Sequence, residues 1–101
     1  MLVGFSIVPV GQGESIGDLV AEVIRIVERS KLPYRLTPMG TVVQGNWDEV
    51  MALLKKCHHK ALSKGRRVMT HISIDDRKGA RNPIQHKIES VERRIGHQVC
   101  R

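Results

Sequence analysis

The side chains that could do chemistry gather in residues 34–44, where two strand-like segments fold about Pro38, Met39 and Gly40. Thr37 offers a hydroxyl group, and Gln44 offers an amide donor and an amide acceptor in one plane. Such groups hold a ligand through hydrogen bonds, but they lack the adjacent base that activates a nucleophile. The run therefore favours ligand binding over catalysis.

Other candidate centres are weaker. The carboxylates of residues 75–76 are followed directly by two cations at 77–78, so we expect an ion-paired turn rather than an acid/base or metal pair. His58 and His59 are adjacent and point to different sides of a helix, which disfavours metal binding. Residues 11–13 lack the spacing of a phosphate-binding loop. We expect no metal, no resident cofactor and no enzyme.

The elements that must position these residues alternate clearly. Residues 2–10 and 66–74 predict strands, and residues 34–44 predict a hairpin of two more. Apolar residues at helical spacing predict helices over 15–31, 46–65 and 82–96, with Ser15, Asn46 and Asn82 as caps. The order β-α-β-β-α-β-α predicts an α+β, ferredoxin-like βαββαβ antiparallel sheet, with helices on one face and an added C-terminal helix.

Two helices on one sheet face leave the other face open. With a four-residue turn at 37–40, the hairpin register places Leu36, Thr41 and Val43 toward the helices. The open face then carries Arg35, Thr37, Val42 and Gln44 from the hairpin, joined by Gly4, Ser6, Val8, Met69, His71 and Ser73. This mixture of apolar and polar groups is typical of an interface or of a small-molecule pocket.

Composition limits the molecule further. The 101 residues predict one domain, 1–101, with an aliphatic core, because aromatic residues make up only 3% of the chain. The apolar first ten residues lack a basic leader and a cleavage site, so we expect a strand there rather than a signal peptide. We expect no membrane span, and two cysteines without a framework spacing favour reduced thiols in the cytoplasm.

Four ordered segments carry a family resemblance. They are residues 6–11, residues 34–41, Trp47-Asp48-Glu49-Val50, and Ile72 to Arg77. With their spacing they cover nearly the whole chain, and they resemble the small thiamine-binding protein family. That family comprises single ferredoxin-like domains whose two-domain relatives bind thiamine or its hydroxymethylpyrimidine part.

The resemblance implies a non-catalytic binding protein that assembles with itself, commonly as a homotetramer, with ligand sites near subunit contacts. Thiamine or hydroxymethylpyrimidine is the implied ligand, since an aminopyrimidine presents ring acceptors beside an amino donor. Gln44 can pair with such an edge as Gln pairs with adenine. The candidate ligand-binding residues are Ser6, Thr37, Met39, Gly40, Gln44 and His71.

Four of these residues also have a plainer interpretation. Thr37 and Gln44 can be exposed strand residues, Met39 a turn residue and His71 part of an interface. Similar proteins often carry Glu near the position of Gln44, and a neutral amide cannot neutralise the thiazolium charge of thiamine.

Charge supports a rival function. A net charge of +7, from 17 Lys and Arg against 10 acids, is not explained by a cationic ligand. A basic ferredoxin-like domain can bind RNA across its open face, although that mode stacks bases on strand aromatics, which this face lacks. Nucleic acid is therefore the less favoured partner, and an oligomeric interaction module without a ligand is the third alternative.

Overall fold

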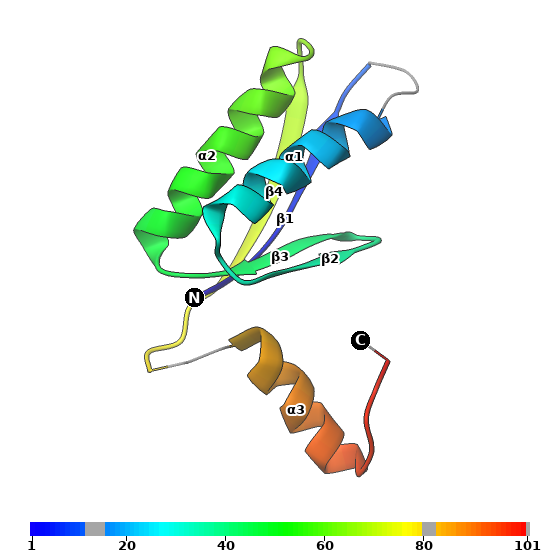
Figure 1. Cartoon of the computed structure of the whole chain (residues 1–101), viewed down its shortest axis with the longest axis vertical. Helices are drawn as coiled ribbons and strands as arrows, with labels where there is room; N and C mark the ends of the chain where they lie inside the picture. Colours follow the sequence, from blue (N-terminus) through cyan, green and yellow to red (C-terminus); the bar gives the residue numbers. More distant parts are fainter. Residues whose placement is uncertain (12–15, 80–82, 101) are drawn as a thin grey trace.

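A four-stranded antiparallel sheet carries α1 and α2 on one side, while α3 lies beyond one end of it (Figure 1). This computed structural model describes residues 1–11, 16–79 and 83–100. The elements are β1 (Leu2–Pro9), α1 (Ile16–Ser30), β2 (Tyr34–Thr37), β3 (Gly40–Gln44), α2 (Trp47–Ser63), β4 (Val68–Asp75) and α3 (Pro83–Ile95). The strand order β2-β3-β1-β4 confirms the predicted ferredoxin-like βαββαβ fold with an added C-terminal helix.

Local hydrogen bonds explain where the first two helices end or begin. The Ser30 hydroxyl donates to the Val27 carbonyl and accepts from the Leu32 amide, which closes α1. At the start of α2, Asn46 Oδ1 accepts from the Glu49 amide at 2.8 Å and Glu49 Oε1 accepts from the Asn46 amide at 3.2 Å. This reciprocal pair is a capping box, and it confirms the cap predicted at Asn46. The predicted caps Ser15 and Asn82 lie outside the described residues.

The core lies between the sheet and the helices α1 and α2. Its largest fully buried side chains are Val3, Val27, Val43, Val50 and Cys57. Strand pairing confirms the predicted alternation, because Val3 faces Val43 and Phe5 faces Thr41 across β1 and β3. An aliphatic core of this kind is stabilised mainly by removing apolar surface from water.

Leu36 does not join this core. It was predicted to face the helices and build the core with Thr41 and Val43, and its register opposite Thr41 is as predicted. However, its side chain is 56% exposed, because β2 is an edge strand and Leu36 lies one residue before the hairpin turn. Ile72 and Ile74, on the other edge strand β4, are likewise 41% and 42% exposed.

Helix α3 stands apart from the rest of the molecule and contacts β3 (Figure 1). Its predicted apolar stripe is present, but α3 contains no buried residue, and Val91 and Ile95 are about half exposed. The radius of gyration is 15.0 Å, whereas a compact domain of this length has about 13 Å. The added helix therefore presents an apolar stripe that this chain leaves largely uncovered.

Candidate functional site

The hairpin between β2 and β3 is held by Thr37 and Gly40. The Thr37 hydroxyl donates to the Gly40 carbonyl at 2.8 Å and accepts from the Met39 amide at 3.2 Å. Gly40 has a φ of 146°, and a Cβ there would lie 2.9 Å from the Phe5 carbonyl oxygen. The turn thus requires glycine, and it brings the hairpin backbone against β1.

A hollow of about 240 Å³ on the open sheet face lies beside this turn. Five of the six predicted ligand-binding residues line it, namely Ser6, Thr37, Met39, Gly40 and His71. Ser6 and His71 are direct partners across β1 and β4, which explains how residues 65 positions apart meet. The structure therefore gathers residues from three separate segments of the sequence around one small space.

Gly4 is expected on the open face from the strand alternation, but like Val42 and Ser73 it is not among the six predicted ligand-binding residues. It lines the same hollow, between Val42 on β3 and Ser73 on β4, its partners in the two ladders. No atom lies within 4 Å of a Cβ built at Gly4, so its missing side chain leaves space above the centre of the sheet. A glycine inside an otherwise apolar strand often marks a close approach by a ligand or another backbone, and this signal was present in the sequence.

The lining of the hollow mixes hydroxyl, imidazole and apolar groups. Ser6 and Ser73 provide hydroxyl groups, His71 provides an imidazole, and Val42 and Met39 provide apolar surface. No Asp, Glu, Lys or Arg side chain lines it. Ligand pockets generally enclose about 300–1,000 Å³, so this hollow suits a single small ring or one half of a larger site.

Gln44 is not brought together with the other five residues. It lies on the same face, but four residues along β3 from Gly40, which is roughly 13 Å at about 3.3 Å per residue. Its Oε1 accepts a hydrogen bond of 3.2 Å from the Ile84 amide in the first turn of α3. The described structure thus gives Gln44 a role in docking α3, and its role as a ligand group stays a prediction.

The other polar centres have structural partners. Asp75 forms its salt bridge with Lys87 of α3 and not with a cation of its own turn. The hydrogen bond and the charge of Lys87 hold the pKa of Asp75 below its ordinary value, with a smaller contribution from the charge of Arg77. His58 Nδ1 lies 2.7 Å from the Thr70 hydroxyl, which joins α2 to β4.

Among the residues that the structure describes, no cluster of His, Cys, Asp and Glu is arranged to hold a metal ion. None of the described helices is long and apolar enough to cross a membrane.

Comparison with known proteins decides the family. The profile of the family described as thiamine-binding protein matches residues 3–92. The chain belongs to the thiamine-binding protein family. This membership confirms the resemblance carried by residues 6–11, 34–41, 47–50 and 72–77.

Two relatives of this chain carry the designation UPF0045. UPF0045 protein Mb1933 of Mycobacterium bovis is 38% identical over 94 residues, which cover 92% of each chain. UPF0045 protein YqgV of Bacillus subtilis is 35% identical over 96 residues, covering 89% of this chain and 92% of YqgV.

Solved structures show the same fold. The hypothetical protein MJ1052 of Methanocaldococcus jannaschii superposes with a TM-score of 0.83 at 31% identity, covering 89% of this chain and 93% of that one. A Thermotoga maritima protein described as a candidate thiamine biosynthesis or salvage protein gives a TM-score of 0.79 at 20% identity. That match covers 89% of this chain and 96% of the other, and it supports the fold alone.

Proposed function

We propose that this protein binds thiamine or its hydroxymethylpyrimidine part without converting it, in the hollow beside the β2–β3 turn. Membership of the thiamine-binding family over residues 3–92 is the observation that carries the proposal. The hollow supports it, because hydroxyl and imidazole groups can pair with the acceptors and the amino group of an aminopyrimidine. No side chain of the hollow could neutralise a thiazolium ring, so the neutral pyrimidine is the preferred part of the ligand.

The proposed site is completed by a second copy of the chain, within a homotetramer in the cytoplasm. The hollow is smaller than a typical ligand pocket and open to solvent, which leaves most of a thiamine molecule uncovered by one chain. Beside it the open face exposes Val8 and Met69, each at 45%, and the β4 edge exposes Ile72 and Ile74. Exposed strand edges readily pair with another chain, so the β4 edge and the open face are the proposed contacts.

Gly4 allows the binding site to be blocked without straining the fold. We expect calorimetry to show binding of hydroxymethylpyrimidine or thiamine to the native chain. Gly4→Val places a branched side chain in the free space of the hollow, and we expect it to weaken binding at least tenfold, or about 1.4 kcal/mol. Gly17→Ala, in α1 where a Cβ also meets no atom, is the matched control and should leave affinity unchanged.

Two results would count against this function. Absence of both heat and thermal shift with either ligand would exclude thiamine recognition. Normal binding by a folded Gly4→Val variant would mean that the binding site lies in another part of the molecule.

The assembly is tested separately, by light scattering during size-exclusion chromatography. We expect a mass of four 11.4 kDa chains. Ile72→Lys on β4 should reduce this mass, whereas Leu36→Lys on the opposite edge strand β2 should not, although Leu36 is the more exposed of the two, at 56% against 41%. A monomer for the native chain would refute the tetramer, and an unchanged mass for Ile72→Lys would refute the β4 contact.

A further inference from the structure

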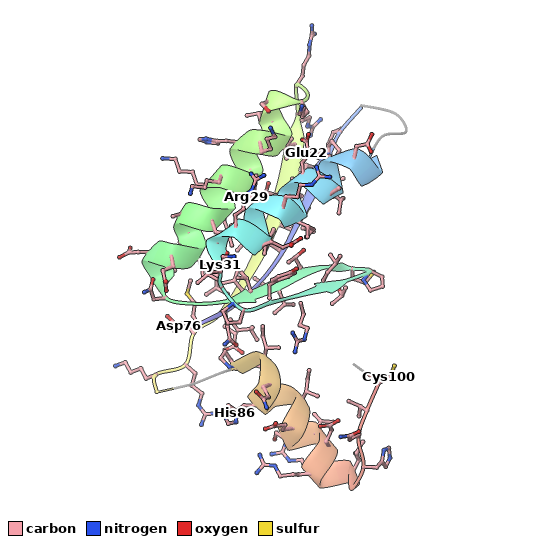
Figure 2. The ribbon with its side chains drawn as sticks, in the orientation of Figure 1. Glu22, Arg29, Lys31, Asp76, His86 and Cys100 are labelled. Atoms are coloured by element: carbon pink, nitrogen blue, oxygen red, sulfur yellow. The ribbon has the colours of Figure 1, made fainter. Side chains whose placement is uncertain are left out.

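A second and larger hollow lies where α3 meets the end of β4. It measures about 900 Å³ and is lined by the last residue of β4, the turn that follows and one side of α3. Figure 2 shows Asp76 on the segment that leads from β4 and His86 on α3, on the side facing this segment. This hollow shares no lining residue with the one beside the β2–β3 turn, so it is a distinct place on the molecule.

Positive charge dominates its lining. The cationic side chains are Arg77, Lys78, Lys87, Arg93 and Arg94, whereas the single carboxylate is Asp75. Asp75 is already paired with Lys87. Among residues 1–11, 16–79 and 83–100, no salt bridge involves Arg77, Lys78, Arg93 or Arg94. These four cations therefore have no salt-bridge partner among the described residues, although the charge of Arg77 also acts on Asp75.

The helical dipole explains only part of this arrangement. Arg93 and Arg94 occupy the last turn of α3, where cations are favoured by the carbonyl ends of the helix. Lys87, Ser90 and Arg94 follow at intervals of three and four residues, which places them on one helix face. The dipole gives no reason for Arg77 and Lys78, from a separate segment, to line the same hollow as that face.

We infer that this hollow binds the phosphate or diphosphate group of a small anionic molecule. Guanidinium groups match phosphate oxygens in paired, charge-assisted hydrogen bonds, and Ser90 adds a hydroxyl donor to the cations around it. A small ligand is favoured over nucleic acid because no Phe, Tyr or Trp lines the hollow, and single-stranded nucleic acid is usually held by stacking on such rings. A phosphate site would account for part of the net charge of +7, which the proposed thiamine site leaves unexplained.

Calorimetry with inorganic pyrophosphate, at constant ionic strength, tests the inference on the full chain. We expect saturable binding by the native protein. Arg77→Gln combined with Arg94→Gln removes one cation from each side of the hollow and should weaken binding at least tenfold, because each loses charge-assisted contacts. Arg25→Gln combined with Arg66→Gln is the control, since it removes the same charge from exposed arginines outside the hollow and should change affinity less than twofold.

Three outcomes would overturn the inference. The first is no binding of pyrophosphate by the native chain, and the second is an equal loss in both double variants at unchanged melting temperature. The third is that a single-stranded RNA oligonucleotide binds more tightly than pyrophosphate. If its affinity also falls steeply with salt and is lost in the Arg77→Gln/Arg94→Gln variant, the hollow is a nucleic-acid site. None of these results depends on thiamine binding, so the two proposals can fail independently.

Discussion

At Gly40 the hairpin lies directly against β1. The φ of 146° at Gly40 is rare for residues with a side chain, and an added Cβ would meet the Phe5 carbonyl oxygen at 2.9 Å. We expect Gly40→Ala to lower the free energy of unfolding by about 1–3 kcal/mol, the usual cost of a strained backbone conformation. Urea denaturation measures this loss.

Gly17→Ala is the control for that measurement, because Gly17 lies in helix α1 and an added Cβ there meets no atom. It should be neutral or stabilising by up to about 1 kcal/mol. Equal stability of the two alanine variants would show that the β2–β3 turn tolerates other conformations at position 40.

The two cysteines should differ sharply in reactivity. Cys57 is fully buried in the core, and this burial raises the pKa of its thiol from 9.0 to about 11. Cys100 is exposed near the end of the chain (Figure 2). Because the thiolate is the reactive form, iodoacetamide at mildly alkaline pH should modify Cys100 at least about a hundredfold faster than Cys57.

Mass spectrometry of the labelled peptides measures the two rates. Unfolding in guanidinium should make them similar, since it removes the burial. Rapid labelling of Cys57 in the folded protein would mean that α2 opens readily from the sheet.

Single residues also show what the sequence could predict about the site. Ser6 and His71 were assigned to one face by alternation alone, and strand pairing places them directly opposite one another. Gln44 was assigned to the same face with equal justification, but a period of two does not say how far apart two residues lie along the strands. Its bond to the Ile84 amide depends on where α3 docks, which no local pattern records.

Few polar contacts attach helix α3 to the sheet. The one that contains a titratable carboxyl group is the salt bridge between Asp75 and Lys87. The pKa of Asp75 lies below the ordinary 3.8 because Lys87 donates a hydrogen bond and contributes a positive charge. A lowered pKa in the folded protein means that the contribution of Asp75 is fully present above the unfolded value. It is lost as the pH falls through the lowered value.

We therefore expect α3 to loosen from β4 only below about pH 4, with hydrogen exchange of its amides as the measurement. Asp75→Asn should show the faster exchange already at neutral pH. Glu89→Gln, on α3 but bonded to Gln85 of the same helix, should not. Protection factors in α3, which correct for the intrinsic pH dependence of exchange, that are independent of pH and of Asp75 would assign its docking to Gln44 and the apolar contacts.

The elements themselves were largely predictable, and their surroundings were not. The capping box at Asn46 and the apolar spacing of α2 are local, so the sequence contains all that determines them. Leu36, Ile72 and Ile74 have the alternation of core residues yet remain exposed, because alternation indicates a face and not how far the helices cover it. The same limit applies to the half-exposed Val91 and Ile95 of α3.

At the scale of the molecule, the extended shape predicts that stability depends on assembly. The chain measures 46 by 28 by 20 Å, and its apolar α3 stripe, β4 edge and open face lack cover. If copies of the chain cover these surfaces, folding and association are linked by mass action. The melting temperature should then rise by roughly 5 °C or more over an about hundredfold increase in protein concentration.

Differential scanning calorimetry at both ends of this concentration range measures the shift, with Ile72→Lys as the comparison. The variant should melt at a lower temperature that varies less with concentration. A melting temperature of the native chain that is independent of concentration would mean that these surfaces are stable in contact with water.

The position of β1 in the sheet also governs when the chain can fold during synthesis. β1 is made first, yet its two neighbours are β3 and β4, and Leu2 pairs with Asp75. One edge of this apolar strand must therefore wait for β3 at residues 40–44, and its other edge stays unpaired until β4 at residues 68–75 has emerged. Pairing between residues so distant in sequence slows folding, and a waiting apolar strand can associate with other nascent chains. High expression at low temperature, or in cells rich in chaperones, should favour the soluble product.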